Sequence, residues 1–239
     1  MNNEFDRRQF FSTAGVAAAG LALGGELIPA SASAQTPPVP NAPYQAKALP
    51  FDPSHIKGMS EKILTSHYEN NYVGAVKRLN AIDTELASLD WKIAPTFVIN
   101  GLKREELIAA NSMILHEHFF GAIGGDGQPT GVLEDAIKRD FGSVDRWRAE
   151  FSAMGKAEGG GSGWVILTYS PRDKRLVNCW AADHTTTLAG GRPVLVLDMY
   201  EHAYHMDYGA KAASYVDAFM QNIRWDNAAS LYTRYSGET

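Results

Sequence analysis

The stretch Asp198-Met-Tyr-Glu-His-Ala-Tyr-His-Met-Asp-Tyr208 directly follows an apolar run, Pro193-Val-Leu-Val-Leu197. The run is short and contains β-branched residues, which predicts a buried strand. This strand would present Asp198 at its end, and His202 would follow four residues later on the next turn. A carboxylate and an imidazole at this spacing can bind one metal ion, and such a ligand pair suits iron, manganese or zinc. An aspartate and a histidine also occur at this spacing without a metal, so a structural role for the pair stays open.

The composition narrows the class of protein. The chain has 239 residues, 45% of them hydrophobic, which is enough for one large domain or two small ones with a buried core. A net charge of −5 and the lack of a lysine or arginine cluster argue against nucleic-acid binding. The single cysteine, Cys179, excludes an intrachain disulfide and a site with several thiolates, and its apolar neighbours favour a buried, unreactive thiol. Beyond the N-terminus, no apolar stretch is long enough for a transmembrane helix.

Residues 1–34 have the composition of an export signal. Arg7 and Arg8 precede bulky apolar residues, an apolar stretch rich in alanine and glycine follows, and small residues lead to a cleavage site after Ala34. This order resembles a twin-arginine (Tat) signal peptide. The resemblance implies export of the folded protein by the Tat machinery to the periplasm, with no stable membrane insertion after cleavage. The alternative, a helix that stays attached, is weaker because a segment without a polar face packs poorly on a core.

Two long helices are expected after a leader. Residues 35–53 hold six prolines and no hydrophobic period, which predicts an extended leader. Apolar residues then recur at helical spacing, first from an N-cap at Ser60 and again beyond Asn100-Gly101. The two helices are predicted over residues 60–89 and 103–120, and they would form a helical-hairpin domain over residues 54–125.

Residues 126–239 are expected to form a C-terminal α/β domain, after a glycine-rich break that begins at Gly124. It would contain two short helices, three strands and two closing helices, in that order. The predicted ranges are 132–141 and 144–156 for the first helices, 164–169, 175–180 and 193–198 for the strands, and 211–222 and 225–235 for the last helices. The predicted fold class is therefore α+β, with a long helical hairpin followed by a three-stranded antiparallel sheet and its helices.

The predicted hairpin offers two further histidine ligands. His67 lies on an apolar face of the first helix, where a lone histidine is more often a hydrogen-bonded core residue, and that alternative stays open. On the second helix, His116 and His118 are two positions apart and point about 200° away from each other, so only one can face a metal. His116 is preferred, because aromatic residues follow it three and four positions later and share its face. His118 is then expected at the surface or in the outer shell of the site.

Together these motifs resemble the iron/manganese superoxide dismutase family. The resemblance covers most of residues 49–235, including Leu49-Pro-Phe51, the histidines of both helices, the turn Gly161-Ser-Gly-Trp164 and the string that begins at Asp198. It implies an enzyme that converts superoxide to O2 and H2O2 at one iron or manganese ion, and the sequence does not choose between the two metals. The implied metal ligands are His67, His116, Asp198 and His202, with a water or hydroxide as the fifth.

The resemblance also implies roles for residues around the ion. Trp164 would form a wall of the pocket, and Tyr200 stands where most relatives carry a tryptophan. Glu201 would reach across the interface of a homodimer to a ligand histidine of the other subunit. The bound water needs a hydrogen-bond donor; Ser112 stands where some relatives carry a glutamine, but it is too short. His184, in the loop after the second strand, is the candidate, and a solvent-exposed loop histidine stays open as its alternative.

The chain departs from the family around the approach to the ion. Most relatives carry a histidine where this chain has Asn71, a tyrosine where it has Ala75, and a tyrosine where it has His205. The first two changes remove groups that usually relay protons. Asn71 and His205 correspond to a pair that hydrogen-bonds across the dimer, so the exchange could preserve a polar link in a homodimer or tetramer. A non-catalytic metal-binding protein and another oxidoreductase, such as a peroxidase, are therefore alternative functions.

Overall fold

The structure is a computed structural model that describes residues 43–158 and 161–238. The expected Tat signal and the leader up to residue 42 lie outside the described residues. The described residues belong to one compact unit, in which the hairpin and the sheet region share a core.

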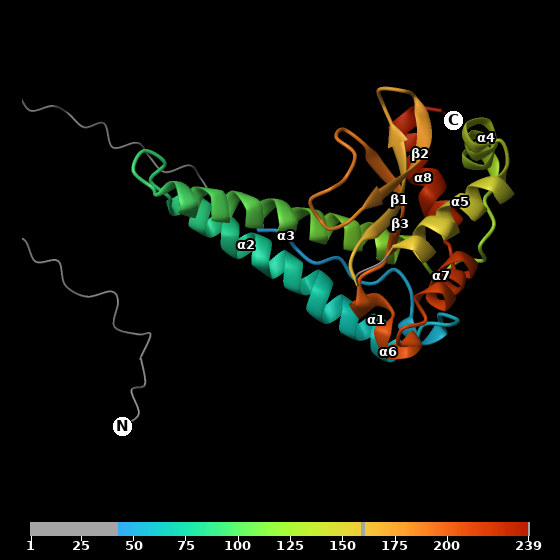
Figure 1. The fold of residues 1–239 in the computed structure, drawn as a ribbon, viewed down its shortest axis with the longest axis horizontal. Helices are drawn as coiled ribbons and strands as arrows, with labels where there is room; N and C mark the ends of the chain where they lie inside the picture. Colours follow the sequence, from blue (N-terminus) through green and yellow to red (C-terminus); the bar gives the residue numbers. More distant parts are fainter. Residues whose placement is uncertain (1–42, 159–160, 239) are drawn as a thin grey trace, which may run out of the picture. The chain divides into compact units, whose positions relative to one another are not determined.

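A long helical hairpin forms the N-terminal part and extends away from the sheet (Figure 1). Its elements are a 3-10 turn (η1, Pro53–His55), α1 (Glu61–Ser66), a π-helical segment (η2, His67–Tyr72), α2 (Val73–Ser88) and α3 (Thr96–Ala122). Ser60 caps α1, since its Oγ accepts a hydrogen bond from the backbone N–H of Ile63 at 3.2 Å. The helices α2 and α3 pack against each other along the hairpin.

Two details of the hairpin differ from the sequence prediction. The first helix is interrupted by η2, which begins at His67; π-helical segments are frequent at functional sites. The second helix begins at Thr96 rather than near Lys103, so Asn100-Gly101 lies inside a helix instead of before it. A glycine within a helix costs about 1 kcal/mol relative to alanine, and the packing of α3 against α2 and the sheet outweighs that cost.

The C-terminal part contains a three-stranded antiparallel sheet in the order β2-β1-β3, which confirms the predicted α+β fold. The strands are β1 (Trp164–Ser170), β2 (Arg175–Ala181) and β3 (Arg192–Asp198). Every residue of the central strand β1 is buried, as its almost wholly apolar sequence predicts. The register pairs Trp164 with Asp198, so the last residue of β3 lies beside the first residue of β1.

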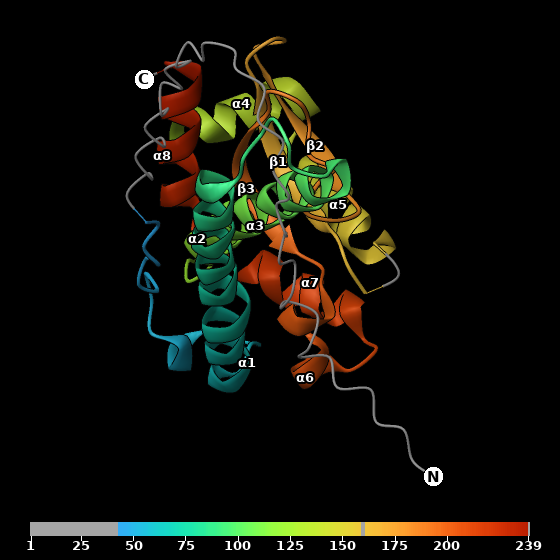
Figure 2. The same ribbon diagram turned by 90° about the vertical axis from the view of Figure 1, so that its left-hand side faces the viewer.

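Helices surround the sheet on the side away from the hairpin tip (Figures 1 and 2). They are α4 (Gly131–Phe141), α5 (Val144–Ala157), α7 (Ala212–Gln221) and α8 (Trp225–Ser236), while η3 (Glu201–Ala203) and α6 (His205–Tyr208) form the turn after β3. Helix α4 packs against β2 and α5 against β1 and β2, whereas α3 packs against β3 and α8 against β3 and β1. No helix in the described part of the chain combines the length and the apolar character that crossing a membrane requires.

Candidate metal centre

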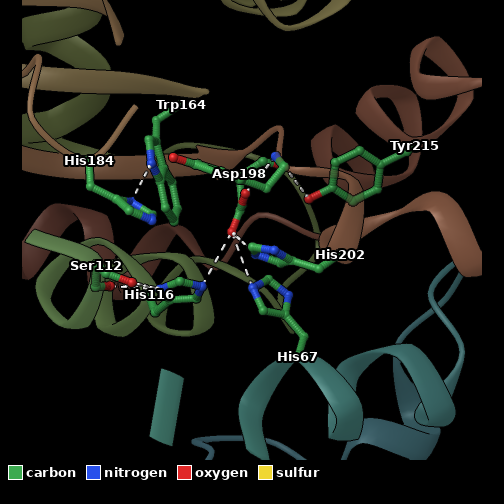
Figure 3. A network of polar contacts seen from close by, with 9 residues as sticks. His67, Ser112, His116, Trp164, His184, Asp198, His202 and Tyr215 are labelled. Carbon is green, nitrogen blue, oxygen red and sulfur yellow. Dashed lines mark hydrogen bonds and ion pairs between the residues drawn. The ribbon is translucent and has the colours of Figure 1, made fainter. Parts of the chain in front are cut away.

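Four side chains from both halves of the chain converge in the interior (Figure 3). His67 begins η2, His116 lies on α3, Asp198 ends β3, and His202 lies in η3. Each residue offers one ligand atom, and these atoms all lie within 4.8 Å of one another. The Nε2 atoms of His67, His116 and His202 are 3.1, 3.6 and 3.3 Å from Oδ2 of Asp198. All three imidazoles therefore point at one carboxylate oxygen.

The cluster has the properties of a metal site. His67, His116 and Asp198 are buried, and Nε2 of each of these two histidines faces Oδ2 of Asp198 without forming a hydrogen bond of proper geometry with any described residue. A buried polar atom without a partner costs about 1–3 kcal/mol, so these nitrogens call for a ligand that the protein itself does not provide. Imidazole nitrogens with one carboxylate oxygen are suitable donors for iron or manganese. The residues therefore fit a single ion of this kind.

Hydrogen bonds on the outer side of the cluster orient the ligand atoms. Nδ1 of His116 lies 2.6 Å from the carbonyl oxygen of Ser112, so it carries the proton and Nε2 keeps its lone pair for a metal. Oδ1 of Asp198 accepts the backbone N–H of Tyr200 at 2.8 Å, which leaves Oδ2 for the cluster. The hydroxyl of Tyr215 donates to the carbonyl oxygen of Asp198 at 2.8 Å and fixes the end of β3.

The protonation states also suit a metal. Burial lowers the pKa of His67 and lowers the pKa of His116 to about 3, because a buried imidazole gains a charge at high cost. Burial alone would raise the pKa of Asp198, but the interactions of its carboxylate with His202 and His67 outweigh burial, and the pKa lies below its usual range. At neutral pH His67 and His116 are thus neutral imidazoles beside an ionised Asp198, which are the forms that bind metals.

An aromatic wall holds His184 beside the cluster. Nε1 of Trp164 donates a hydrogen bond to Nδ1 of His184 at 3.1 Å. An indole nitrogen can only donate, so Nδ1 is the acceptor and the proton of the neutral His184 ring sits on Nε2. The ring of Tyr200 stacks on His184 with centroids 4.7 Å apart and on His202 with centroids 5.3 Å apart. His184 is half-buried in this wall and is not an exposed loop residue.

Three other candidate residues lie outside the cluster. Glu201 is exposed and packs against the turn at Gly161, where an added Cβ would lie 3.1 Å from its side chain. His205 is also exposed. His118 is half-buried on α3 rather than at the surface, and burial lowers its pKa to about 4. Its ring makes no aromatic contact with the ligand histidines, whereas the ring of His116 contacts both His67 and His202.

A cavity of about 340 Å³ lies against the cluster. Asn71 and Ala75 line one side of it, and His116, His184 and His202 line the other. Two of the positions where the chain departs from the family pattern, Asn71 and Ala75, therefore line a cavity beside the cluster, whereas His205 does not. A small alanine at position 75 leaves this space wide.

The comparisons with known proteins agree with this geometry. Residues 129–231 match the family model of the C-terminal domain of iron/manganese superoxide dismutases. The superoxide dismutase [Fe] of Cupriavidus metallidurans is 68% identical over 189 residues, which cover 79% of this chain and 96% of that protein. The chain belongs to the iron/manganese superoxide dismutase family.

More distant members of the superoxide dismutase family include enzymes of both metals. The superoxide dismutase [Mn] 2 of Halobacterium salinarum is 36% identical over 193 residues, which cover 79% of this chain and 94% of that protein. The superoxide dismutase [Fe] of Aquifex pyrophilus is 36% identical over 184 residues, covering 73% of this chain and 84% of that protein. These matches do not favour a non-catalytic metal-binding protein or a peroxidase.

Some residues of this dismutase site could not be found from the sequence. The hydroxyl of Tyr215 holds the carbonyl of Asp198, the side chain of Asn111 donates to the carbonyl of His184, and Arg78 lines the cavity. None of them belongs to a motif or has a fixed spacing to a ligand. Their roles arise from tertiary packing, for which the chain carries no local signal.

Proposed function

We infer that this protein is a superoxide dismutase with one metal ion held by His67, His116, Asp198 and His202. The convergence of these side chains on one buried oxygen, in a chain 68% identical to a superoxide dismutase [Fe], carries this conclusion. When bound, the ion supplies a one-electron couple that is reduced by one superoxide and oxidised by the next. Two superoxide ions and two protons then become O2 and H2O2.

The protein groups hold the ion and deliver the protons. His67 and His116 offer neutral nitrogens, and the ionised Asp198 offsets part of the positive charge of an ion. Trp164 excludes bulk water from one side of the pocket. We assign His184 the role of hydrogen-bond donor inside the pocket, because its Nδ1 is taken by Trp164 and its Nε2–H is left to donate. Tyr200 stays protonated at physiological pH, since burial raises its pKa to about 12.

The activity is tested with matched histidine variants on α3. We expect the metal-loaded protein to remove superoxide far faster than the same concentration of free metal ion. His116→Gln should lose both metal and activity, while His118→Gln, two residues further along the helix, should keep both. Metal analysis and rapid-mixing decay of superoxide are the measurements. A His116→Gln protein with unchanged metal content would refute the assignment of the centre.

We propose iron as the native metal. The relative at 68% identity is a superoxide dismutase [Fe], whereas the manganese relatives reach 36% identity. The ligand set by itself accepts either ion. Metal analysis of protein purified from its own cells, with activity measured after reloading each ion separately, tests this proposal. Activity that returns with manganese alone contradicts it.

We also propose that the Tat machinery exports the protein to the periplasm and that residues 1–34 are removed. The twin Arg7 and Arg8, the alanine-rich stretch and the small residues before position 35 support this. Tat carries folded proteins, so the ion would be acquired before export. We expect the full chain to appear in the periplasmic fraction with Gln35 as its first residue, and a chain with Arg7→Lys and Arg8→Lys to stay in the cytoplasm. Equal export of both chains contradicts the proposal.

Finally, we propose that the enzyme is at least a homodimer, joined through Glu201 and His205. Both residues are exposed near the centre. Nε2 of His202 faces Asp198, and its Nδ1 forms no hydrogen bond with the described residues. The second nitrogen of a metal-binding histidine usually donates to a carboxylate or carbonyl. Glu201 of a second subunit would supply that acceptor.

A further inference from the structure

We propose that a second cavity, apart from the metal centre, binds a small organic anion that carries a carboxylate or phosphate group on a planar body. This cavity has a volume of about 420 Å³ and lies between residues 47–50, the C-terminal part of α3 and helix α8. In Figure 2 the described end of the leader, drawn in blue, runs beside α2. The two cavities share no lining residue. The volume is in the usual range of small-molecule sites, about 300–1,000 Å³.

The lining of this cavity has an excess of positive charge. Lys47, Arg224 and Arg234 line it, and Glu117 is the only carboxylate among its lining residues. Lys47 already pairs with Glu117, so no carboxylate inside the cavity is left for the two arginines, and Arg224 pairs only with Asp226, which lies outside the lining. Arg234 forms no ion pair or hydrogen bond with any residue in 43–158 and 161–238. Two guanidinium groups at the rim of one cavity favour an anion and disfavour a neutral or cationic ligand.

The side chain of Arg224 has a hydrogen-bond donor, Nε, that the described residues leave without an acceptor. Its Nε is buried and has no hydrogen-bond partner among the described residues. Arg224 forms an ion pair with Asp226, whose Oδ1 lies 3.5 Å from Nε, too far for a hydrogen bond of proper geometry, and Asp226 does not line the cavity. A buried donor without a partner is costly, and an anionic oxygen in the cavity would supply the missing acceptor.

The wall opposite α8 is rigid. The hydroxyl of Tyr72 accepts the backbone N–H of Lys47 at 2.8 Å and donates to Oε1 of Glu117 at 3.1 Å. The hydroxyl of Tyr68 donates to the carbonyl oxygen of Lys47 at 2.9 Å. These hydrogen bonds hold Lys47 of the leader against the helices, so the fold itself sets the shape of this side of the cavity. On the α8 side, Asn227 and Arg234 lie seven residues apart and share one face of the helix.

The remaining lining residues define the body of the ligand. Tyr68, Phe120 and Tyr235 present aromatic rings, and Leu49 and Leu231 add apolar surface. Rings and aliphatic side chains pack against a flat apolar body, while arginine binds carboxylate and phosphate with two parallel hydrogen bonds. An aromatic carboxylate and a nucleoside monophosphate share this chemistry.

The cavity also adjoins the metal centre through one side chain. Phe120 lines the cavity and contacts His67 with ring centroids 5.0 Å apart. A ligand that packs on Phe120 is thus one aromatic ring away from a metal-binding histidine.

Calorimetric titration of the metal-loaded enzyme tests the proposal. The probes are benzoate, AMP and inorganic phosphate, with adenosine as the uncharged control. We expect at least one of the anions to bind with one site per chain, and adenosine to bind far more weakly. Binding of benzoate would identify a carboxylate ligand and binding of AMP a phosphate ligand, and either result supports the site. Binding of inorganic phosphate without benzoate or AMP would contradict the planar body.

Charge-removal variants locate the binding. Arg234→Gln, on the exposed side of α8, and Arg224→Gln should each weaken binding by about tenfold or more, the usual effect of losing a charge-assisted hydrogen bond. Arg172→Gln is the matched control, because the Arg172 side chain is 94% exposed in the turn between β1 and β2. The proposal is overturned if none of the anions binds or if adenosine binds as tightly as they do. It is also overturned if anion binding is unchanged in both the Arg224→Gln and the Arg234→Gln variants.

Discussion

At the scale of single residues, the centre depends on which ring nitrogen of each histidine carries the proton. His116 donates from Nδ1 to a carbonyl oxygen and so keeps Nε2 free. His184 is held in the opposite, Nε2–H form and can donate a hydrogen bond from Nε2, because the indole of Trp164 can only donate to its Nδ1. One tryptophan thus sets the chemical form of the proposed proton donor.

Replacing His184 tests this role. His184→Leu should keep the metal, since the residue is not among the ligands, but lower kcat by about a hundredfold, a typical loss for a proton-transfer group. His184→Gln retains an N–H donor and should lose less. Metal content and kcat are measured together, with His55→Gln, whose side chain is 80% exposed, as the control. Unchanged kcat in the leucine variant would exclude His184 from proton delivery.

The roles of some of these residues can be predicted from the sequence, and the roles of others cannot. Helical periodicity indicates that only one of His116 and His118 can face a metal, and the aromatic residues that share the face of His116 favour His116. The contact between Trp164 and His184 joins β1 to the loop after β2 and depends on the register of the sheet. No regular spacing in the sequence predicts such a hydrogen bond. The sequence alone therefore cannot distinguish a donor role for His184 from a solvent-exposed position in the loop.

At the scale of elements, ligands on separate helices and strands must be held at fixed positions. Asp207, five residues after His202, binds the first turn of the helix that leads to His67. Its Oδ2 accepts the backbone N–H of Ser60 at 2.7 Å and its Oδ1 accepts the Ser60 hydroxyl at 2.6 Å. The turn after β3 and the start of α1 are therefore clamped together, which sets the distance between two metal ligands.

Breaking this clamp should weaken the fold and the site together. We expect Asp207→Ala to lower the free energy of unfolding by about 1–2 kcal/mol, the value of one to two exposed hydrogen bonds at a helix cap. Urea denaturation of the metal-loaded protein measures the change, and metal content should fall as well. Asp135→Ala, an exposed carboxylate on α4, is the control. Equal stability of the two variants would show that the clamp contributes nothing.

The strands can be predicted from the sequence more accurately than the helices of the hairpin. The strands were predicted to within a residue because apolar runs bounded by glycine and turn residues are distinctive. The π-helical segment η2 was missed, since its residues carry the same apolar spacing as an ordinary helix. The early start of α3 was missed because Asn100-Gly101 is typical of a break, and only the packing of the hairpin overrides it.

At the scale of the whole molecule, buried histidines make the metal-free protein sensitive to acid. The pKa of His116 is about 3 in the folded chain against an ordinary value of 6.5, because burial disfavours the charged ring. Between these values the unfolded chain binds a proton that the folded chain does not, so stability is full above pH 6.5 and declines as the pH falls toward 3. Urea denaturation of the metal-free protein across this range should show the decline. His116→Gln should make it shallower, and an equally steep decline would contradict this origin.

Assembly of two subunits is the second prediction at this scale. If Glu201 binds the second subunit's His202, Glu201→Ala should raise the dimer Kd by about tenfold or more and also lower metal content. Sedimentation equilibrium and metal analysis measure the two effects, again with Asp135→Ala as the control. A variant that keeps its dimer and loses only metal would place Glu201 in the site without a role in assembly.

The ligand positions also govern when the site can come into existence. The first proposed ligand is residue 67 and the last is residue 202, so during synthesis the hairpin histidines emerge long before the aspartate and the histidine that complete the set. No fragment that ends before the last strand can hold the ion with all four groups. Metal content therefore reports that almost the entire polypeptide has been made and folded. A secretion system that accepts only folded proteins would accept a metal-loaded molecule, because the bound ion shows that the chain has already folded.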